Sequence, residues 1–155
     1  MLSEYWGEKM YIGAGTVLTP TQAELTAKAG GRFIISPDTN PAVIKKTCSM
    51  GLISMPGALT PTEIQTAHNA GAHYVKLFPI GNLGTGYVKA VKAPLSHVKM
   101  LAVGGVDLSN IADYKKIGIF GFGIGTSIVD KSLIAAKDFA GITALARKYV
   151  NAIKE

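Results

Sequence analysis

The sequence contains little cysteine and little charge. Its single cysteine, Cys48, among 155 residues excludes an internal disulfide framework and a metal site made of several cysteines. A chain with one cysteine is expected in a reducing, cytoplasmic compartment. Charged residues make up 17% and hydrophobic residues 48%, a composition that excludes a disordered chain. We therefore expect residues 1–155 to form one globular domain.

Long apolar segments are also absent. The uncharged stretch Ile117 to Val129 is too short and too rich in glycine to cross a bilayer. The first residues have neither a basic region nor an apolar run, so they do not predict a signal peptide. We expect no membrane partner.

Arginine is scarce although the net charge is positive. Sixteen basic and ten acidic residues give a formal charge of +6, but only Arg32 and Arg147 are arginines. The lysines occur singly or in pairs, and no basic stripe interleaved with aromatic residues is found, so we expect no nucleic-acid partner. The lysines fit solvated helix faces, and a small anionic substrate is the other explanation of the positive charge that stays open.

One helix start occurs twice. Thr19-Pro20-Thr21-Gln22 returns as Thr60-Pro61-Thr62-Glu63, and an Ala-Gly pair follows each copy at the same distance. The threonine is expected to cap a helix that begins at proline, with glutamine or glutamate completing a capping box. The later glycine ends the helix. The two copies therefore predict two equivalent helices, each leading into a short apolar strand.

Short apolar segments recur roughly every 20 to 26 residues, with helix-length segments between them. This succession predicts an α/β fold, a parallel barrel of the TIM (β/α)8 type, rather than a dinucleotide-binding sheet, whose glycine fingerprint is incomplete here. A complete barrel needs about 200 residues or more, so about six of the eight units are expected. The predicted strands are Ile12–Val17, Arg32–Pro37, Leu52–Pro56, His73–Pro79, Lys99–Gly104 and Ile119–Gly125.

A lysine inside a predicted strand is the strongest candidate for chemistry. Lys76 lies between Val75 and Leu77, so alternation turns its side chain to the opposite face, the barrel interior. Burial there disfavours the ammonium form, and the free amine can attack a carbonyl. A lysine paired with a carboxylate, or one that reaches solvent at the strand end, fits the same position. Position alone leaves these alternatives open.

Glycine-rich turns follow the last two predicted strands. They are Val103-Gly104-Gly105-Val106 and Gly123-Ile124-Gly125-Thr126-Ser127. Their backbone N–H groups and the Ser127 hydroxyl can bind a phosphate, as the loops after the last two strands of such barrels often do. Glycines that only permit tight turns are the alternative. The three histidines have no cysteine or carboxylate cluster beside them, so no metal site is expected.

From Tyr11 onward the sequence resembles one family in several segments, in order. The family is that of the class I aldolases for 2-keto-3-deoxy-6-phosphogluconate (KDPG), 4-hydroxy-2-oxoglutarate (KHG) and 2-keto-3-deoxy-6-phosphogalactonate. The resemblance implies a homotrimeric TIM barrel without a cofactor that cleaves a phosphorylated keto acid substrate to pyruvate and glyceraldehyde 3-phosphate. The segments are residues 13–18, 36–37, 56–63, 75–79, 103–106 and 123–127.

The resemblance also implies roles for individual residues. Lys76 corresponds to the catalytic lysine that forms a Schiff base with the substrate. The substrate-binding residues are Thr16 at the pyruvate carboxylate, Pro37 and Phe78 lining the pocket, and Gly104, Gly105 and Ser127 at the phosphate.

The family's first two βα units are not represented in the sequence. In the family they carry the general-base glutamate and a nearby substrate-binding arginine, and no residue before Ile12 replaces them. Three functions therefore stay open. The chain is an active Schiff-base aldolase, a truncated and catalytically impaired barrel that still binds pyruvate and phosphate, or another phosphate-binding barrel enzyme, such as an epimerase or synthase, that has no need of Lys76.

Overall fold

The computed structural model describes residues 2–154, in which short parallel strands alternate with helices. No helix in this range is both long and apolar enough to span a membrane. In chain order the elements are α1 (Leu2–Trp6), β1 (Gly13–Ala14), α2 (Pro20–Lys28), β2 (Phe33–Ile35), α3 (Pro41–Ser49), β3 (Ile53–Met55), β4 (Gly57–Ala58), α4 (Pro61–Asn69), β5 (Val75–Leu77), α5 (Gly84–Lys92), β6 (Met100–Val103), α6 (Ile111–Lys116), β7 (Gly121–Gly123), α7 (Lys131–Ala135) and α8 (Phe139–Lys154).

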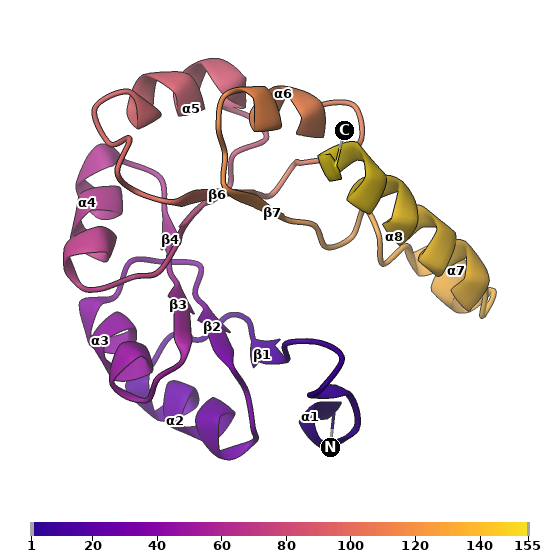
Figure 1. Ribbon diagram of the computed structural model, residues 1–155, viewed down its shortest axis with the longest axis horizontal. Helices are drawn as coiled ribbons and strands as arrows, with labels where there is room; N and C mark the ends of the chain where they lie inside the picture. The colour runs from indigo at the N-terminus through magenta and orange to yellow at the C-terminus, as the bar shows by residue number, and fades with distance from the viewer. Residues whose placement is uncertain (1, 155) are drawn as a thin grey trace.

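The strands form the inner layer of an open arc. One sheet has the order β1-β2-β3 and the other β4-β5-β6-β7, and every pairing is parallel. Figure 1 shows α2 to α6 on the outer side of the strands, with α1 and α8 on the two sides of the opening. This arrangement confirms the predicted α/β barrel fold, present as an incomplete circle of βα units.

One predicted strand is divided in two. The sequence predicts a continuous strand over Leu52–Pro56, but β3 ends at Met55 and β4 begins at Gly57. Pro56 has no N–H to donate to a neighbouring strand, so the ladder is interrupted there. Its carbonyl still accepts a 2.8 Å hydrogen bond from the backbone N–H of Lys76. The chain therefore passes from the first sheet to the second at Pro56, directly beside β5.

The repeated helix starts are confirmed. Thr19 and Thr60 each accept a hydrogen bond from the backbone N–H three residues later, and both capping boxes are complete. In the second copy the Glu63 carboxylate accepts hydrogen bonds from the backbone N–H groups of Thr60 and Leu59, at 2.8 and 3.0 Å. These bonds, the one from Thr60 first, lower the pKa of Glu63.

The second capping box gives a pH-dependent prediction. Thr60→Ala should lower the free energy of unfolding by about 1 kcal/mol, because a helix donor loses its acceptor. Since the pKa of Glu63 is depressed in the fold, Glu63→Gln should destabilise the protein above the unfolded pKa of 4.5. That difference from wild type should disappear as the pH falls through the folded pKa. Urea unfolding at several pH values measures it.

The first box supplies the control for this prediction. Gln22 occupies the place of Glu63 there and has no charge to lose. Gln22→Ala should therefore destabilise the protein by an amount that does not change with pH. A pH dependence equal to that of Glu63→Gln would contradict the assignment of the effect to the carboxylate.

The core lies between the strands and the outer helices. The larger cluster packs behind β4 to β7, and a smaller one packs behind β1 to β3. Val75 and Leu77 of β5 belong to the larger cluster and are 1% and 0% exposed. Alternate residues of β5 thus face the helices, and the residue between them faces the inside of the arc.

Candidate active site

Lys76 lies on the inner face of the arc, as the alternation in β5 predicts. Its neighbours in register are Gly57 on β4 and Leu101 on β6. The side chain is half-buried and lines a cavity of about 420 Å³. The other lining residues come from four further strands and the loop after β7, and are Phe33, Ile35, Met55, Leu101, Val103, Phe122, Gly123, Ile124 and Gly125.

The cavity is apolar, and Lys76 is the one ionisable side chain among the described residues that line it. Burial lowers the pKa of Lys76, because the apolar surroundings solvate the ammonium poorly. Within residues 2–154, no carboxylate forms an ion pair with it. Its cationic end lies instead over the ring of Phe78, with 4.0 Å between Nζ and the ring centroid. Burial in the apolar cavity favours the neutral, nucleophilic amine, whereas the Phe78 ring attracts the ammonium form.

Gly104 and Gly105 form the turn that follows β6, and both have positive φ, +81° and +83°. The turn packs on the chain that follows β5, since Gly81 N–H donates to the Gly104 carbonyl at 2.8 Å. A Cβ on Gly105 would lie 2.5 Å from the Cα of Gly81, so the turn requires glycine. On its outer side, the Asn110 side-chain amide donates to the Gly105 carbonyl at 2.9 Å.

The remaining predicted substrate-binding residues also follow the carboxyl ends of strands. Thr16 comes after β1, is exposed and has a φ of +58°. Pro37 comes after β2 and Ser127 after β7, and both are half-buried. None of the three lines the cavity that contains Lys76, and neither do Phe78, Gly104 and Gly105. The structure brings Lys76, Phe78 and Gly104 together, and the roles of all the predicted site residues stay predictions.

The apolar lining was not singled out from the sequence. Phe33, Ile35 and Met55 alternate along β2 and β3, and Leu101 and Val103 alternate along β6. The two-residue alternation of side chains along a strand could have identified them, because it places these residues on the same side of their strands as Lys76 is on β5.

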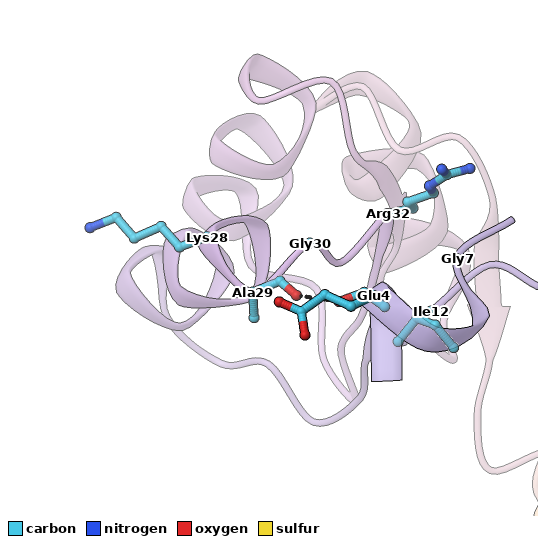
Figure 2. A pocket seen from close by; sticks show the side chains of 8 residues that line it. Glu4, Gly7, Ile12, Lys28, Ala29, Gly30 and Arg32 are labelled. Atoms are coloured by element: carbon cyan, nitrogen blue, oxygen red, sulfur yellow. Dashed lines mark hydrogen bonds between the residues drawn. The ribbon is translucent and has the colours of Figure 1, made fainter. Parts of the chain in front are cut away.

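A second cavity, of about 270 Å³, lies at the opposite end of the strands (Figure 2). It is formed by α1, the end of α2 and the residues just before β1 and β2, and the Ser3 hydroxyl donates to the Ala29 carbonyl across it. Figure 2 shows Lys28 and Arg32 extending in opposite directions, so their charges do not converge on a ligand. Residues 2–154 also contain no group of three or more metal-binding side chains.

Parallel strands on the inside and helices on the outside define this protein as part of a (β/α)8 barrel. The family model for KDPG and KHG aldolases matches residues 4–145, and the chain belongs to this family.

Individual relatives agree with this assignment. The probable 2-dehydro-3-deoxy-6-phosphogalactonate aldolase of Rhizobium meliloti (strain 1021) is 46% identical over 125 residues, 80% of this chain and 59% of that protein. The 2-dehydro-3-deoxy-phosphogluconate aldolase of Treponema pallidum (strain Nichols) is 37% identical over 139 residues, 88% of this chain and 66% of that protein. A solved structure of native KDPGal superposes with a TM-score of 0.88 at 34% identity, covering 99% of this chain and 75% of that one. The chain thus spans about three fifths to three quarters of these proteins.

Proposed function

We propose that the protein is a Schiff-base aldolase that cleaves a 6-phosphorylated 2-keto-3-deoxyhexonate, the gluconate or galactonate epimer, to pyruvate and glyceraldehyde 3-phosphate. The observation that carries the proposal is Lys76, half-buried in an apolar cavity and without an ion pair among the described residues. The relatives named for the two phosphorylated aldonates supply the substrate class. As in the family resemblance, we propose a homotrimer as the assembly.

The amine of Lys76 attacks the C2 ketone of the substrate and forms a carbinolamine. Loss of water gives a protonated imine, which withdraws electrons from C3. The C4 hydroxyl then loses its proton to a base, the C3–C4 bond breaks and its electron pair moves into the imine to give an enamine. Glyceraldehyde 3-phosphate leaves. The enamine takes a proton at C3, and water hydrolyses the resulting imine to release pyruvate and the amine.

The proposed contacts follow the chain of the substrate. Thr16 receives the carboxylate, and Pro37 and Phe78 line the pocket, with Phe78 beside the nitrogen of Lys76. Gly104, Gly105 and Ser127 receive the phosphate, where backbone N–H groups and a hydroxyl can donate hydrogen bonds to its oxygens. The apolar lining excludes water from the imine.

A second candidate is a barrel that forms the imine but turns over slowly. One observation favours it, since no carboxylate lines the cavity within the described residues. The cleavage step needs a group that accepts the C4 hydroxyl proton, and Lys76 cannot do so while it is the imine nitrogen.

The proposed function predicts that KM depends on contacts between the protein and the phosphate group of the substrate. The wild-type protein should release pyruvate from the phosphorylated substrate, and Ser127→Asp should raise its KM roughly 10- to 100-fold, because repulsion replaces a hydrogen bond to a charged group. Ser127→Asn, with nearly the same bulk and no charge, should raise KM less. Pyruvate release, measured for both epimers, and imine formation with pyruvate are compared for each variant.

Two results would contradict this account. Equal loss of phosphorylated-substrate cleavage and of pyruvate imine formation in both Ser127 variants would indicate a folding defect and remove the phosphate assignment. Conversion of a phosphorylated sugar by epimerisation or synthesis, unchanged in Lys76→Ala, would replace the aldolase by another barrel enzyme.

A further inference from the structure

Lys76 and Phe78 are held on the same side of β5. They are two residues apart, so their side chains share a face of the strand. The backbone N–H of Lys76 donates to the Pro56 carbonyl at 2.8 Å, and that of Phe78 donates to the Ala58 carbonyl at 3.2 Å. The strand pairing with β4 therefore extends through both residues and fixes where their side chains begin.

The chain beyond Phe78 is fixed to β6. Ile80 N–H donates to the Val103 carbonyl at 3.1 Å, and Gly81 N–H donates to the Gly104 carbonyl at 2.8 Å. The segment that carries Phe78 is thus hydrogen-bonded on one side to β4 and on the other to the end of β6. The Phe78 backbone has little freedom to move its ring away from Lys76.

Gly104 provides the surface against which the ring lies. A Cβ built on Gly104 would lie 3.0 Å from Cδ2 and 3.1 Å from Cε2 of Phe78. Both distances are shorter than ordinary carbon contacts, so any side chain at this position would displace the ring. The positive φ of Gly104, +81°, also favours glycine. The ring position thus depends on the residue that begins the proposed phosphate turn.

The ring in turn faces the nitrogen of Lys76. Nζ lies 4.0 Å from the ring centroid, well inside the range in which the negative face of an aromatic ring attracts a cation. A lysine side chain is flexible, and no carboxylate of the described residues holds this one by an ion pair. The Phe78 ring is the contact that limits where its nitrogen lies.

We propose that Phe78 is a positioning residue that holds the Lys76 nitrogen at the site of imine formation, and that Gly104 leaves the space in which the Phe78 ring lies. This inference rests on the proposed function. The nitrogen that the ring faces as an ammonium is the same atom that carries positive charge in the protonated imine. The ring therefore faces the cation before and after the covalent bond forms, and Gly104 links the phosphate turn to the lysine.

The test uses Phe78→Leu and the conservative variant Phe78→Tyr. Leucine keeps an apolar side chain but has no ring, so the midpoint of the Lys76 titration should fall by about 0.5 to 1.5 pH units. Pyruvate trapping by cyanoborohydride, at a pH above both midpoints, should slow about 10-fold because the nitrogen is less well placed. Tyrosine keeps the ring and should retain both values. The 13C shift of Lys76 Cε, assigned with Lys76→Arg, reports the midpoint without requiring the reaction.

Two further variants separate the ring contact from general damage. Gly104→Ala should lower the Lys76 midpoint in the same direction, although it changes neither Lys76 nor Phe78. Phe120→Leu should leave the midpoint and the trapping unchanged. Phe120 is a matched control because its ring lies 5.4 Å from the nitrogen of another lysine, Lys99, outside the cavity.

The outcomes distinguish this inference from the proposed function. An unmoved midpoint in folded Phe78→Leu, with trapping intact, would overturn the role of Phe78 and leave the aldolase function standing. Equal losses in Phe78→Leu and Phe78→Tyr would also overturn it, since the ring would then not matter. Failure of the wild-type protein to trap pyruvate at any pH would instead contradict the proposed function.

Discussion

Adding two βα units ahead of Ile12 should raise turnover of the aldol substrate by about 10²–10⁴-fold. Lys76 is the one ionisable side chain of residues 2–154 that lines the cavity, so in the proposed reaction none of the described lining side chains can accept the proton of the C4 hydroxyl. The family resemblance places the general-base glutamate at the end of the second unit, upstream of Ile12. A chimera that takes its first two units from the Rhizobium meliloti relative is the extended chain for this test.

The matched control is the same chimera with that glutamate changed to glutamine. It closes the barrel equally but cannot accept the proton, so its rate should return toward that of the 155-residue chain. Steady-state rates of the three proteins measure the effect. Equal rates for the short chain and the glutamate-containing chimera would show that the chain already has a base, and would contradict the assignment of the missing group.

The same chimera should change how the protein associates. In the described part of the chain, β1 pairs only with β2 and β7 only with β6, which leaves one side of each strand without a strand partner. Phe139 and Val150 of α8, beside the opening in Figure 1, are 65% and 49% exposed. Unpaired edges and apolar surface favour association or aggregation. We expect sedimentation to show association beyond the proposed trimer, or poor solubility, for the short chain, and less of either for the chimera.

The local features of the fold were predictable because their causes are local. Thr19 and Thr60 cap their helices through residues only three positions away, and Asn40 caps α3 by accepting a hydrogen bond from the backbone N–H of Ala42, two positions away. Lys76 faces inward because side chains alternate along any strand. The sequence did not predict that the strand divides at Pro56. The missing N–H of proline interrupts a ladder only where a neighbouring strand would accept its hydrogen bond, and that neighbour is set by the fold.

The contacts within the candidate site were not predictable to the same extent. The resemblance assigned Phe78 to the pocket and Gly104 to the phosphate, but nothing in the sequence indicated that the two touch. Their contact depends on how the end of β5 lies against the end of β6, a relation between segments about 25 residues apart. Phe33 and Met55 line the cavity for a similar reason, because the curvature of the sheet brings distant strands around Lys76.

Lys76→Arg should abolish imine formation and turnover together. A guanidinium stays protonated at any accessible pH and does not attack a carbonyl, while the positive charge and much of the side-chain bulk are retained. Lys99→Arg is the control, because Lys99 precedes β6, lies over Tyr74 and Phe120 and does not line the cavity. That variant should keep wild-type activity. Turnover of the phosphorylated substrate measures both, and comparable residual turnover in the two variants would contradict a specific role for Lys76.

The central claim is that the amine of Lys76 forms the covalent bond to the keto acid. Its most direct test is incubation of the protein with pyruvate and borohydride, followed by digestion and tandem mass spectrometry. The account predicts one reduced pyruvyl adduct, on the peptide that contains Lys76, and its loss in Lys76→Ala. Adducts spread over other lysines, or an unchanged adduct in Lys76→Ala, would contradict it.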